Sequence, residues 1–413
     1  MSYVVGLKCK ECGHRVEAGP AHVCPQCFGP FEVEYDYARL KGKCTRQSIE
    51  AGPRSLWRYK DLLPVVTPKS GFSSGFTPLK RSKRLAAELG VKELYIKDDT
   101  CNSPTFSYKE RVVSVAITKA IEFGFETIAC ASTGNLANST AAHAAAAGLR
   151  CYVMIPHDLE RGKVVGSQIF GPTTVRIKGN YDDVNRLCSE IADKHGWAIV
   201  NVNLRPYYTE GAKTFGFEIA EQLGWKLPQH TVSPVAGGTI LPKIYKAYRE
   251  FIELGIVEDN QPKLYAAQAA GCDPVVTAIH KGSDIIEPQK PRTIAKSIAI
   301  GNPADGYYVQ QIIRECGGWG ESATDEEIVD AIKLLARTEG IFTEPAGGAT
   351  LASAIKLIQS GRIPADESIC IGITGNGWKC IEAVQDDLEP SQIIDPSLEA
   401  FDELLEGQRA VAV

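Results

Sequence analysis

Short apolar runs alternate with helical patterns along most of the chain from about residue 76 onward. The runs that predict strands cover residues 93–97, 127–130, 151–155, 174–178, 198–202, 230–235, 263–268 and 368–374. Helical patterns follow several of them, at 137–147, 182–194 and 240–251. Apolar strands that alternate with helices are typical of parallel sheets covered on both faces. The pattern therefore predicts an α/β fold.

The two ends of the chain differ from this central body. Residues 1–45 hold four cysteines and short β-like pieces, so we expect a small separate module there. Residues 46–75 are mixed and polar, and we interpret them as a connector that wraps onto the body. Residues 386–413 predict a helical tail, in which 395–406 form a short acidic helix that Gly407 stops.

Composition narrows the class of protein. The chain has 413 residues, of which 44% are hydrophobic and 23% charged, as in ordinary globular proteins. A net charge of −5 gives no basis for binding nucleic acid or an anionic membrane, and no apolar run is long enough to span one. The N-terminus lacks the pattern of a signal peptide, and the 13 cysteines are scattered. We expect a reduced, cytoplasmic protein without nucleic-acid or membrane partners.

Two cysteine pairs predict a metal site in the first module. Cys9-Lys-Glu-Cys12 and Cys24-Pro-Gln-Cys27 supply four thiolates, the ligand set of a tetrahedral zinc ion. A redox-active site would need only one such pair. No histidine or carboxylate completes an open coordination sphere, so we predict structural Zn²⁺ in a zinc ribbon over 1–45.

Lys109 is the most informative residue of the body. It follows the strand at 93–97 and a polar loop, and Ser107 and Glu110 have the spacing of a capping box. Lys109 would then lie in the first turn of a helix, where a cation opposes the helix dipole and the neutral amine is favoured. A neutral, partly buried amine suits Schiff-base chemistry. Alone, the motif favours a solvated lysine in an ordinary capped helix, and only the rest of the chain reverses this interpretation.

Four further loops follow predicted strands or precede helices, where folds of this class bind ligands. They are Ser132–Leu136, Ala236–Ile240, Thr343–Gly348, which precedes a helix expected near Ala349, and Thr374–Gly377. The paired glycines of the second loop can close around a phosphate at a helix N-terminus. The loop matches neither nucleotide-binding glycine motif, so no nucleotide is indicated. Each loop alone is also consistent with a plain turn.

Taken in order, Lys109 and these loops resemble the threonine synthase family of fold-type II pyridoxal-phosphate enzymes. The resemblance covers residues 76–385, and the cysteine pairs resemble the N-terminal extension of one branch, of which this chain could be a diverged paralogue. It implies two parallel-sheet α/β domains, a smaller one at about 112–203 and a larger one from the remainder of the body. It also implies a homodimer.

The resemblance assigns roles by position. Lys109 would hold pyridoxal 5'-phosphate as a Schiff base, Asn135 would contact its 3-hydroxyl, and Thr374 would face its ring nitrogen. The cofactor phosphate would lie in a cradle of Ala236, Gly237, Gly238, Thr239 and Ile240. Ser132 and Thr133 would hold the α-carboxylate of an amino-acid substrate.

The implied reaction is that of a carbon–oxygen lyase, which converts O-phosphohomoserine and water to threonine and phosphate. A second anion site is then needed for the substrate phosphate, and the candidates are Lys97, Arg111, Arg205 and Lys213. The latter two are equally consistent with surface salt bridges.

The chain departs from the family pattern around Lys109. Ser103, Phe106, Tyr108 and Glu110 stand where the branch has His, Leu, Phe and Asp. Ser103 matters most if that histidine binds the substrate, and we therefore count Ser103 as a candidate substrate residue. Arg111, one of the cations named above, is a second candidate. Two alternatives remain: replacement or elimination on another small or phosphorylated amino acid with the same cofactor, and a non-catalytic zinc-ribbon regulatory protein.

Overall fold

The computed structural model describes residues 2–411 except 22, 71, 133, 158–160 and 180. The chain divides into two compact units, Met1–Cys380 and Ile381–Val413. The second unit contains the short turns η4 (Ile381–Ala383) and η5 (Gln385–Asp387) and the helix α15 (Leu398–Val411). Because α15 continues through Gly407, the predicted stop at this glycine was wrong.

The larger sheet of the first unit has the strand order β12-β11-β10-β13-β5-β4. Its strands are β4 (Leu79–Arg81), β5 (Glu93–Asp98), β10 (His230–Pro234), β11 (Lys263–Ala269), β12 (Trp319–Ala323) and β13 (Ser368–Ile373). All pairs are parallel except the edge pair β4–β5. Every residue of β10 is buried, which explains why this strand is a continuous run without alternation.

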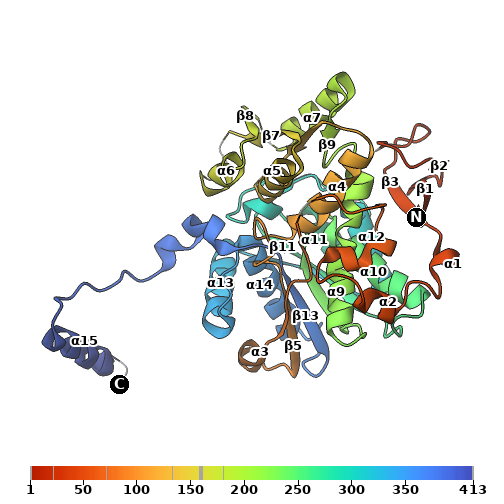
Figure 1. Ribbon diagram of the computed structural model, residues 1–413. Coiled ribbons are helices and arrows are strands. Elements are labelled where there is room, and N and C mark those ends of the chain that lie inside the picture. The colour runs from red at the N-terminus through yellow and green to blue at the C-terminus, as the bar shows by residue number, and fades with distance from the viewer. Residues whose placement is uncertain are drawn as a thin grey trace. The chain divides into compact units, whose positions relative to one another are not determined.

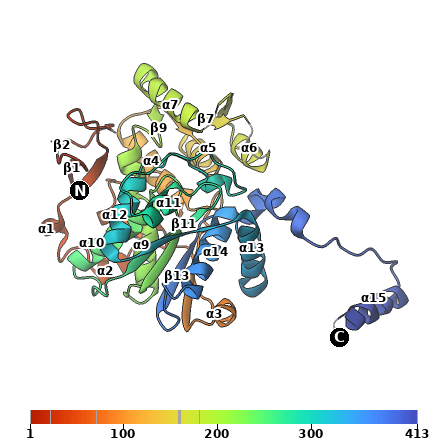
Figure 2. The ribbon, with the colours of Figure 1, turned by 180° about the vertical axis from the view of Figure 1, so that it is seen from behind.

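The larger sheet is accompanied by a set of helices and short turns, and most of these helices contact its strands (Figures 1 and 2). They are α3 (Lys83–Leu89), α8 (Arg205–Glu210), α9 (Lys213–Gln222), α10 (Ile240–Glu253), α11 (Pro274–Lys281), α12 (Gly306–Cys316), α13 (Asp325–Glu339) and α14 (Pro345–Gln359), with the short turns η2 (Lys296–Ile298) and η3 (Gly377–Lys379). The helix α14 contacts β10 to β13 and α13. No helix within the described part of the chain is long and apolar enough to cross a membrane.

The smaller sheet is parallel throughout, with the order β8-β7-β6-β9. Its strands are β6 (Thr127–Ala131), β7 (Arg150–Pro156), β8 (Thr173–Ile177) and β9 (Ala198–Ile199). They alternate with α4 (Lys109–Glu122), α5 (Asn135–Ala147), α6 (Arg161–Gln168) and α7 (Tyr181–His195), all in the upper part of Figure 1. Two parallel sheets with their helices confirm the predicted α/β fold class.

The N-terminal segment forms a small antiparallel sheet of order β2-β1-β3. Its elements, with those that follow, are β1 (Val4–Cys9), β2 (Arg15–Val16), β3 (Phe31–Tyr35), α1 (Tyr37–Leu40), α2 (Arg46–Glu50) and η1 (Leu56–Leu62). Strand β3 contacts α8, and the Tyr35 hydroxyl donates to Glu210 Oε2 at 2.9 Å. Glu32 pairs with Lys243 of α10. Strand β3 therefore joins this sheet to the body through buried polar contacts.

Strand register explains how distant loops meet. Asp98 at the end of β5 is paired with Ile373 at the end of β13, so the segments that follow both strands leave the sheet at the same edge. Ser107 forms a bridge with Gly375, and the Tyr108 amide donates to the Thr374 carbonyl at 2.8 Å. Lys109, the first residue of α4, consequently lies beside the Thr374 loop.

Some sequence predictions about helix starts were wrong. The helix expected near Ala349 begins at Pro345, because proline is well suited to the first helical turn and the two glycines after it are part of the helix. Ser107 and Glu110 form no capping box. The Glu110 carboxylate turns inward instead and bonds His143 Nε2 at 2.8 Å.

Candidate active site

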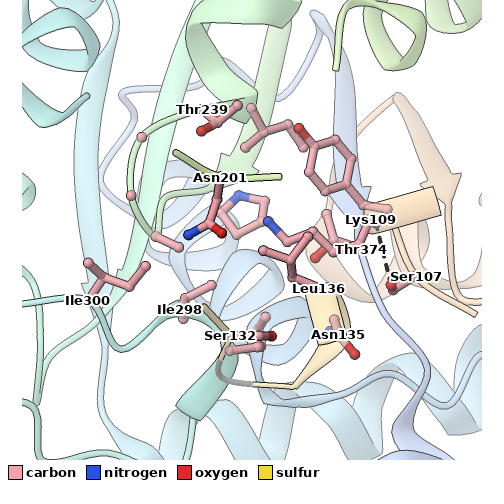
Figure 3. Close-up of a pocket in the computed structure, with 18 of the residues that line it drawn as sticks. Ser107, Lys109, Ser132, Asn135, Leu136, Asn201, Thr239, Ile298, Ile300 and Thr374 are labelled. Atoms are coloured by element: carbon pink, nitrogen blue, oxygen red, sulfur yellow. Dashed lines mark hydrogen bonds between the residues drawn. The ribbon is translucent and has the colours of Figure 1, made fainter. Parts of the chain in front are cut away.

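A pocket lies where loops after β6, β10 and β13 meet the start of α4 (Figure 3). Lys109, Ser132, Asn135, the segment 236–240 and Thr374 all line it. This is the carboxyl edge of the parallel strands, where open α/β sheets bind ligands. The helices α4, α5 and α10 begin at the pocket, so their positively polarised N-termini favour an anionic ligand there.

Lys109 is half-buried, and its ammonium group contacts a second helix. Its Nζ donates to the Tyr208 hydroxyl of α8 at 3.1 Å, and its backbone amide donates to Ser107 Oγ at 3.4 Å. Tyr208 is only 5% exposed and lines the same pocket. The two groups thus form a polar pair from separate elements in one cavity.

The glycine loop is fixed closely against a neighbouring segment. Gly238 has a φ of +93°, and a Cβ there would lie 2.7 Å from the Asp305 carbonyl carbon. The Asp305 amide donates to the Gly237 carbonyl at 2.8 Å. Only glycine fits position 238 without strain, and the loop leads directly into α10. This is a suitable cradle for a phosphate group.

Asn135, the first residue of α5, is held from two sides. Its Nδ2 donates to both oxygens of Glu344, at 2.8 and 2.9 Å, and its Oδ1 accepts from Lys379 Nζ at 2.7 Å. Ser297 Oγ also donates to Glu344, at 3.1 Å. Burial lowers the pKa of Lys379, and the nearby Glu344 and Glu110 oppose this shift.

Ser132 and Thr374 also reach the pocket. Ser132 Oγ accepts from the amides of Gly134 and Ala137, at 3.0 and 2.9 Å, so it orders the start of α5. Thr374 directly follows β13 and is 8% exposed. Thr133, the other predicted carboxylate ligand, lies outside the described residues.

The four N-terminal cysteines form a compact cluster. The sulfur atoms of Cys9, Cys12, Cys24 and Cys27 all lie within 4.8 Å of one another. Two of the distances, Cys9–Cys27 at 3.5 Å and Cys12–Cys24 at 3.7 Å, are close to the ~3.8 Å between sulfurs in a tetrahedral site with 2.3 Å metal–sulfur bonds. The donor set therefore suits a metal ion.

Comparisons with known proteins agree with this geometry. The family model described as "Pyridoxal-phosphate dependent enzyme" matches residues 72–375. The threonine synthase of Methanosarcina acetivorans is 40% identical over 405 residues, which is 97% of this chain and 99% of that protein. The threonine synthase of Methanocaldococcus jannaschii is 39% identical over 90% of this chain and 92% of that protein.

The chain belongs to the threonine synthase family. This membership confirms the predicted family of pyridoxal-phosphate enzymes. Among solved structures, Escherichia coli diaminopropionate ammonia lyase matches with a TM-score of 0.66 at 17% identity, over 83% of this chain and 91% of that one. Maize serine racemase matches with 0.62 at 20% identity, over 75% and 93%. At such identities these two structures show a shared fold only.

Three predicted cations do not reach the pocket of this threonine synthase family member. Arg111 is completely buried and bonds Asp99 and Glu218, with its Nε 2.7 Å from Asp99 Oδ2. Lys97 is buried 2.6 Å from Glu218. A third cation, Lys213, lies between two glutamates of α8 and α10. All three cations pair with buried carboxylates, and none of them lines the pocket, so their place in the substrate site has no support from these contacts.

Of the four positions around Lys109 that the sequence singles out, only one lines the pocket. Ser103 is exposed and Phe106 is 48% exposed, so neither reaches it, and Ser103 is not placed to bind a substrate there. Glu110 points to His143 instead. Tyr108 lines the pocket, and its buried hydroxyl has no partner in the described part of the chain.

The sequence gives little or no signal for several residues that line the pocket or contact its lining. Arg205 was named as a weak candidate, yet it lines the pocket and pairs with Asp305 at 2.8 Å. The sequence predicts no role for Tyr208 or Lys379, and it predicts Glu344 only as part of a turn. Nothing in the local sequence marks Tyr208 or Lys379, because their importance comes from contacts with Lys109 and Asn135.

Proposed function

We propose that this member of the threonine synthase family converts O-phosphohomoserine and water to L-threonine and phosphate. The observation that carries the proposal is the gathering of Lys109, the glycine loop 236–240 and Thr374 around one pocket. Full-length identity of 40% to a threonine synthase supports the choice of reaction.

The residues of the pocket fit pyridoxal 5'-phosphate. Lys109 would carry the cofactor, and the start of α10 with Gly237, Gly238 and Thr239 would hold its phosphate. Thr374 offers a neutral hydroxyl to the ring nitrogen. When bound, the cofactor acts as an electron sink that stabilises a carbanion next to the amino group.

Lys109 moves the protons in this proposal. Its amine, free once the substrate has bound, would remove a proton from Cα and then one from Cβ, after which phosphate leaves Cγ with the electrons of its C–O bond. A proton is then added at Cγ, water adds at Cβ with loss of a proton, and a proton returns to Cα to give threonine. The Tyr208 hydroxyl, 3.1 Å from Lys109 Nζ, is placed to exchange protons with the lysine and to orient it.

Arg205 is the residue we propose for the substrate phosphate. Of the four cations considered, it is the one that lines the pocket, with Asn185 and Asn201 in the same lining. Its guanidinium pairs with the Asp305 carboxylate at 2.8 Å, and arginine binds carboxylate and phosphate oxygens in the same bidentate way. Ser132, which precedes α5, would take the α-carboxylate; the other predicted ligand, Thr133, lies outside the described residues.

The cysteine cluster is proposed to hold structural zinc. Four thiolates at near-tetrahedral spacing leave no coordination position for a reactant. The glutamate in the first pair, Glu11, bonds the Tyr308 hydroxyl of α12, so the cluster also docks against the body. We propose that the metal stabilises residues 1–45 and their attachment to the body.

The predicted organisation stays a proposal: a ribbon at 1–45, a connector at 46–75, a catalytic body at 76–385 and a tail at 386–413. The smaller sheet, from Thr127 to Ile199, supports a subdomain at about 112–203. A homodimer and a cytoplasmic location remain predictions. Size-exclusion chromatography with light scattering tests the homodimer.

Phosphate release tests the proposed reaction against its alternative, an elimination or replacement on another amino acid. The cofactor-loaded protein is incubated with O-phosphohomoserine, O-phosphoserine, serine and threonine in parallel, and amino-acid products, phosphate and keto acids are measured. We expect equal amounts of threonine and phosphate from O-phosphohomoserine alone. Keto acid from serine or threonine as the main product would favour the alternative.

A further inference from the structure

Lys379 does not line the pocket, but its side chain hydrogen-bonds Asn135, which does. Its ammonium group donates to Asn135 Oδ1 at 2.7 Å and to the Thr105 carbonyl at 2.9 Å. Lys379 is the last residue of η3, which follows the Thr374 loop, and it does not line the pocket. Lys379 would therefore act on a ligand in the pocket through Asn135 and not by direct contact.

The partners of Asn135 determine which way its amide faces. A lysine ammonium can only donate hydrogen bonds, and an ionised carboxylate can only accept them. Lys379 therefore requires the amide oxygen on its side, and Glu344 requires the amide nitrogen on the other. A flipped amide would direct N–H groups at the ammonium and the carbonyl at the carboxylate, so both contacts would become repulsive.

Each part of this arrangement is held by other contacts. Glu344 is 2% exposed and also accepts from Ser297 Oγ at 3.1 Å. The Glu344 amide donates to the Gly375 carbonyl at 3.0 Å, which fixes the start of α14 against the Thr374 loop. Because Lys379 follows that same loop, the two charges on either side of Asn135 come from segments that are joined to one another.

We propose that Lys379 is a positioning residue that, with Glu344, locks Asn135 as a hydrogen-bond donor toward the 3-oxygen of the cofactor. The inference rests on the proposed function, since it requires the cofactor to bind at Lys109. An amide nitrogen carries two N–H groups, and Glu344 accepts from one side. Both bonds to Glu344 go to the oxygens of one carboxylate, so a single N–H points at it and the second N–H can serve an acceptor in the pocket that Asn135 lines.

The orientation of Asn135 has a spectroscopic consequence. An N–H donor stabilises the anionic form of the 3-oxygen and so keeps the shared proton on the lysine nitrogen, and this form of the lysine-bound cofactor absorbs in the visible. A carbonyl facing the 3-oxygen would favour its protonated form, which absorbs in the near ultraviolet. The ratio of the two bands therefore reports on the orientation of the amide, independently of turnover.

The experiment compares cofactor-loaded wild type with Lys379→Met, Lys379→Gln and Lys379→Arg at one pH. Lys119→Met is the matched control, because it removes another lysine that pairs with a glutamate, at 2.8 Å in α4, without touching Asn135. Measured quantities are the ratio of visible to near-ultraviolet bands, the dissociation constant for pyridoxal 5'-phosphate and the far-ultraviolet circular dichroism.

We expect Lys379→Met to lower the band ratio and to weaken cofactor binding by roughly tenfold, the scale of one hydrogen bond to a charged group. Arginine, which also only donates, should restore both quantities, and Lys119→Met should leave them unchanged. Glutamine can donate or accept, so it should give an intermediate ratio. If the methionine variant does not fold, the band ratio of Lys379→Gln tests whether Lys379 orients Asn135.

A folded Lys379→Met protein with the wild-type band ratio and affinity would overturn the inference. So would a folded arginine variant that behaves like the methionine variant. A wild-type protein without a visible band, or with a band that survives Lys109→Ala, would contradict the proposed function. The inference would then fail with it. These results are distinguishable, because the first two leave the Lys109-dependent band in place.

Discussion

Replacing Arg111 with methionine tests whether this residue stabilises the fold or binds substrate. Arg111 is fully buried and donates to two carboxylates, at 2.7 Å to both oxygens of Asp99 and at 2.8 Å to Glu218 Oε2. The Arg111→Met variant would leave Asp99 without this cation and Glu218 with Lys97 only. Breaking a buried ion pair from one side typically destabilises a protein by about 3–5 kcal/mol.

The lowered pKa of Glu218 gives a second measure of how much its ion pairs stabilise the fold. Burial raises the pKa of Glu218, but the charges of Arg111 and Lys97 outweigh burial and hold it at about 2, against 4.5 for a free glutamate. A pKa lowered by this amount corresponds to stability on the order of 3 kcal/mol. Because the folded-state pKa is the lower one, this stability is present above pH 4.5 and is lost as the pH falls toward 2.

Urea unfolding of the cofactor-free protein at neutral pH is the assay, combined with the KM for O-phosphohomoserine. We expect Arg111→Met to lose about 3 kcal/mol or more of unfolding free energy. The control Arg186→Met removes an exposed pair with Glu190 and should cost only about 0.3–0.5 kcal/mol. If Arg111→Met has the unfolding free energy of the wild type and a raised KM, the structural role is wrong and Arg111 binds the substrate.

Three further predictions concern the cofactor and the metal. Lys109→Ala should remove the visible absorption band of the bound cofactor and all turnover, and a band that survives would assign the cofactor to another residue. Gly238→Ala should lower the melting temperature of the cofactor-free protein through about 1–3 kcal/mol of backbone strain. Gly237→Ala, whose Cβ would meet its nearest atom at 3.8 Å, should not, and equal melting temperatures would contradict the strained loop. Removing the metal with a chelator should lower the melting temperature and expose Tyr308. The reason is that Lys10, between Cys9 and Cys12 in the sequence, places its ammonium group 3.2 Å from the centre of the Tyr308 ring. An unchanged melting temperature after complete metal removal would contradict a structural metal.

Sequence reasoning reached the pocket because its residues follow strands. The runs at 93–97, 230–235 and 368–374 became β5, β10 and β13, and the loops after them carry local signals, such as two adjacent glycines. The carboxyl edge of a parallel sheet then brings them together, whatever lies between them in the chain. This explains why Lys109 and Thr374 could be placed in one site from motifs alone.

Long-range charge pairing could not be predicted in the same way. Arg111 lies close to Lys109 in the sequence, which suggests a substrate ligand, yet its partner Glu218 is 107 residues away. Whether a cation faces a ligand or a buried carboxylate depends on the packing of α4 against α9, which no local pattern encodes. The same reason explains why Lys379 was overlooked although it lies only a few residues after Thr374.

The most direct test of the central claim is the fate of water oxygen during turnover. The cofactor-loaded protein is incubated with O-phosphohomoserine in water labelled with heavy oxygen, and the products are analysed by mass spectrometry. The account predicts one labelled oxygen in the hydroxyl group of threonine and none in phosphate, because water adds at Cβ after the C–O bond of Cγ has broken. Labelled phosphate with homoserine, or a keto acid with ammonia, would contradict it.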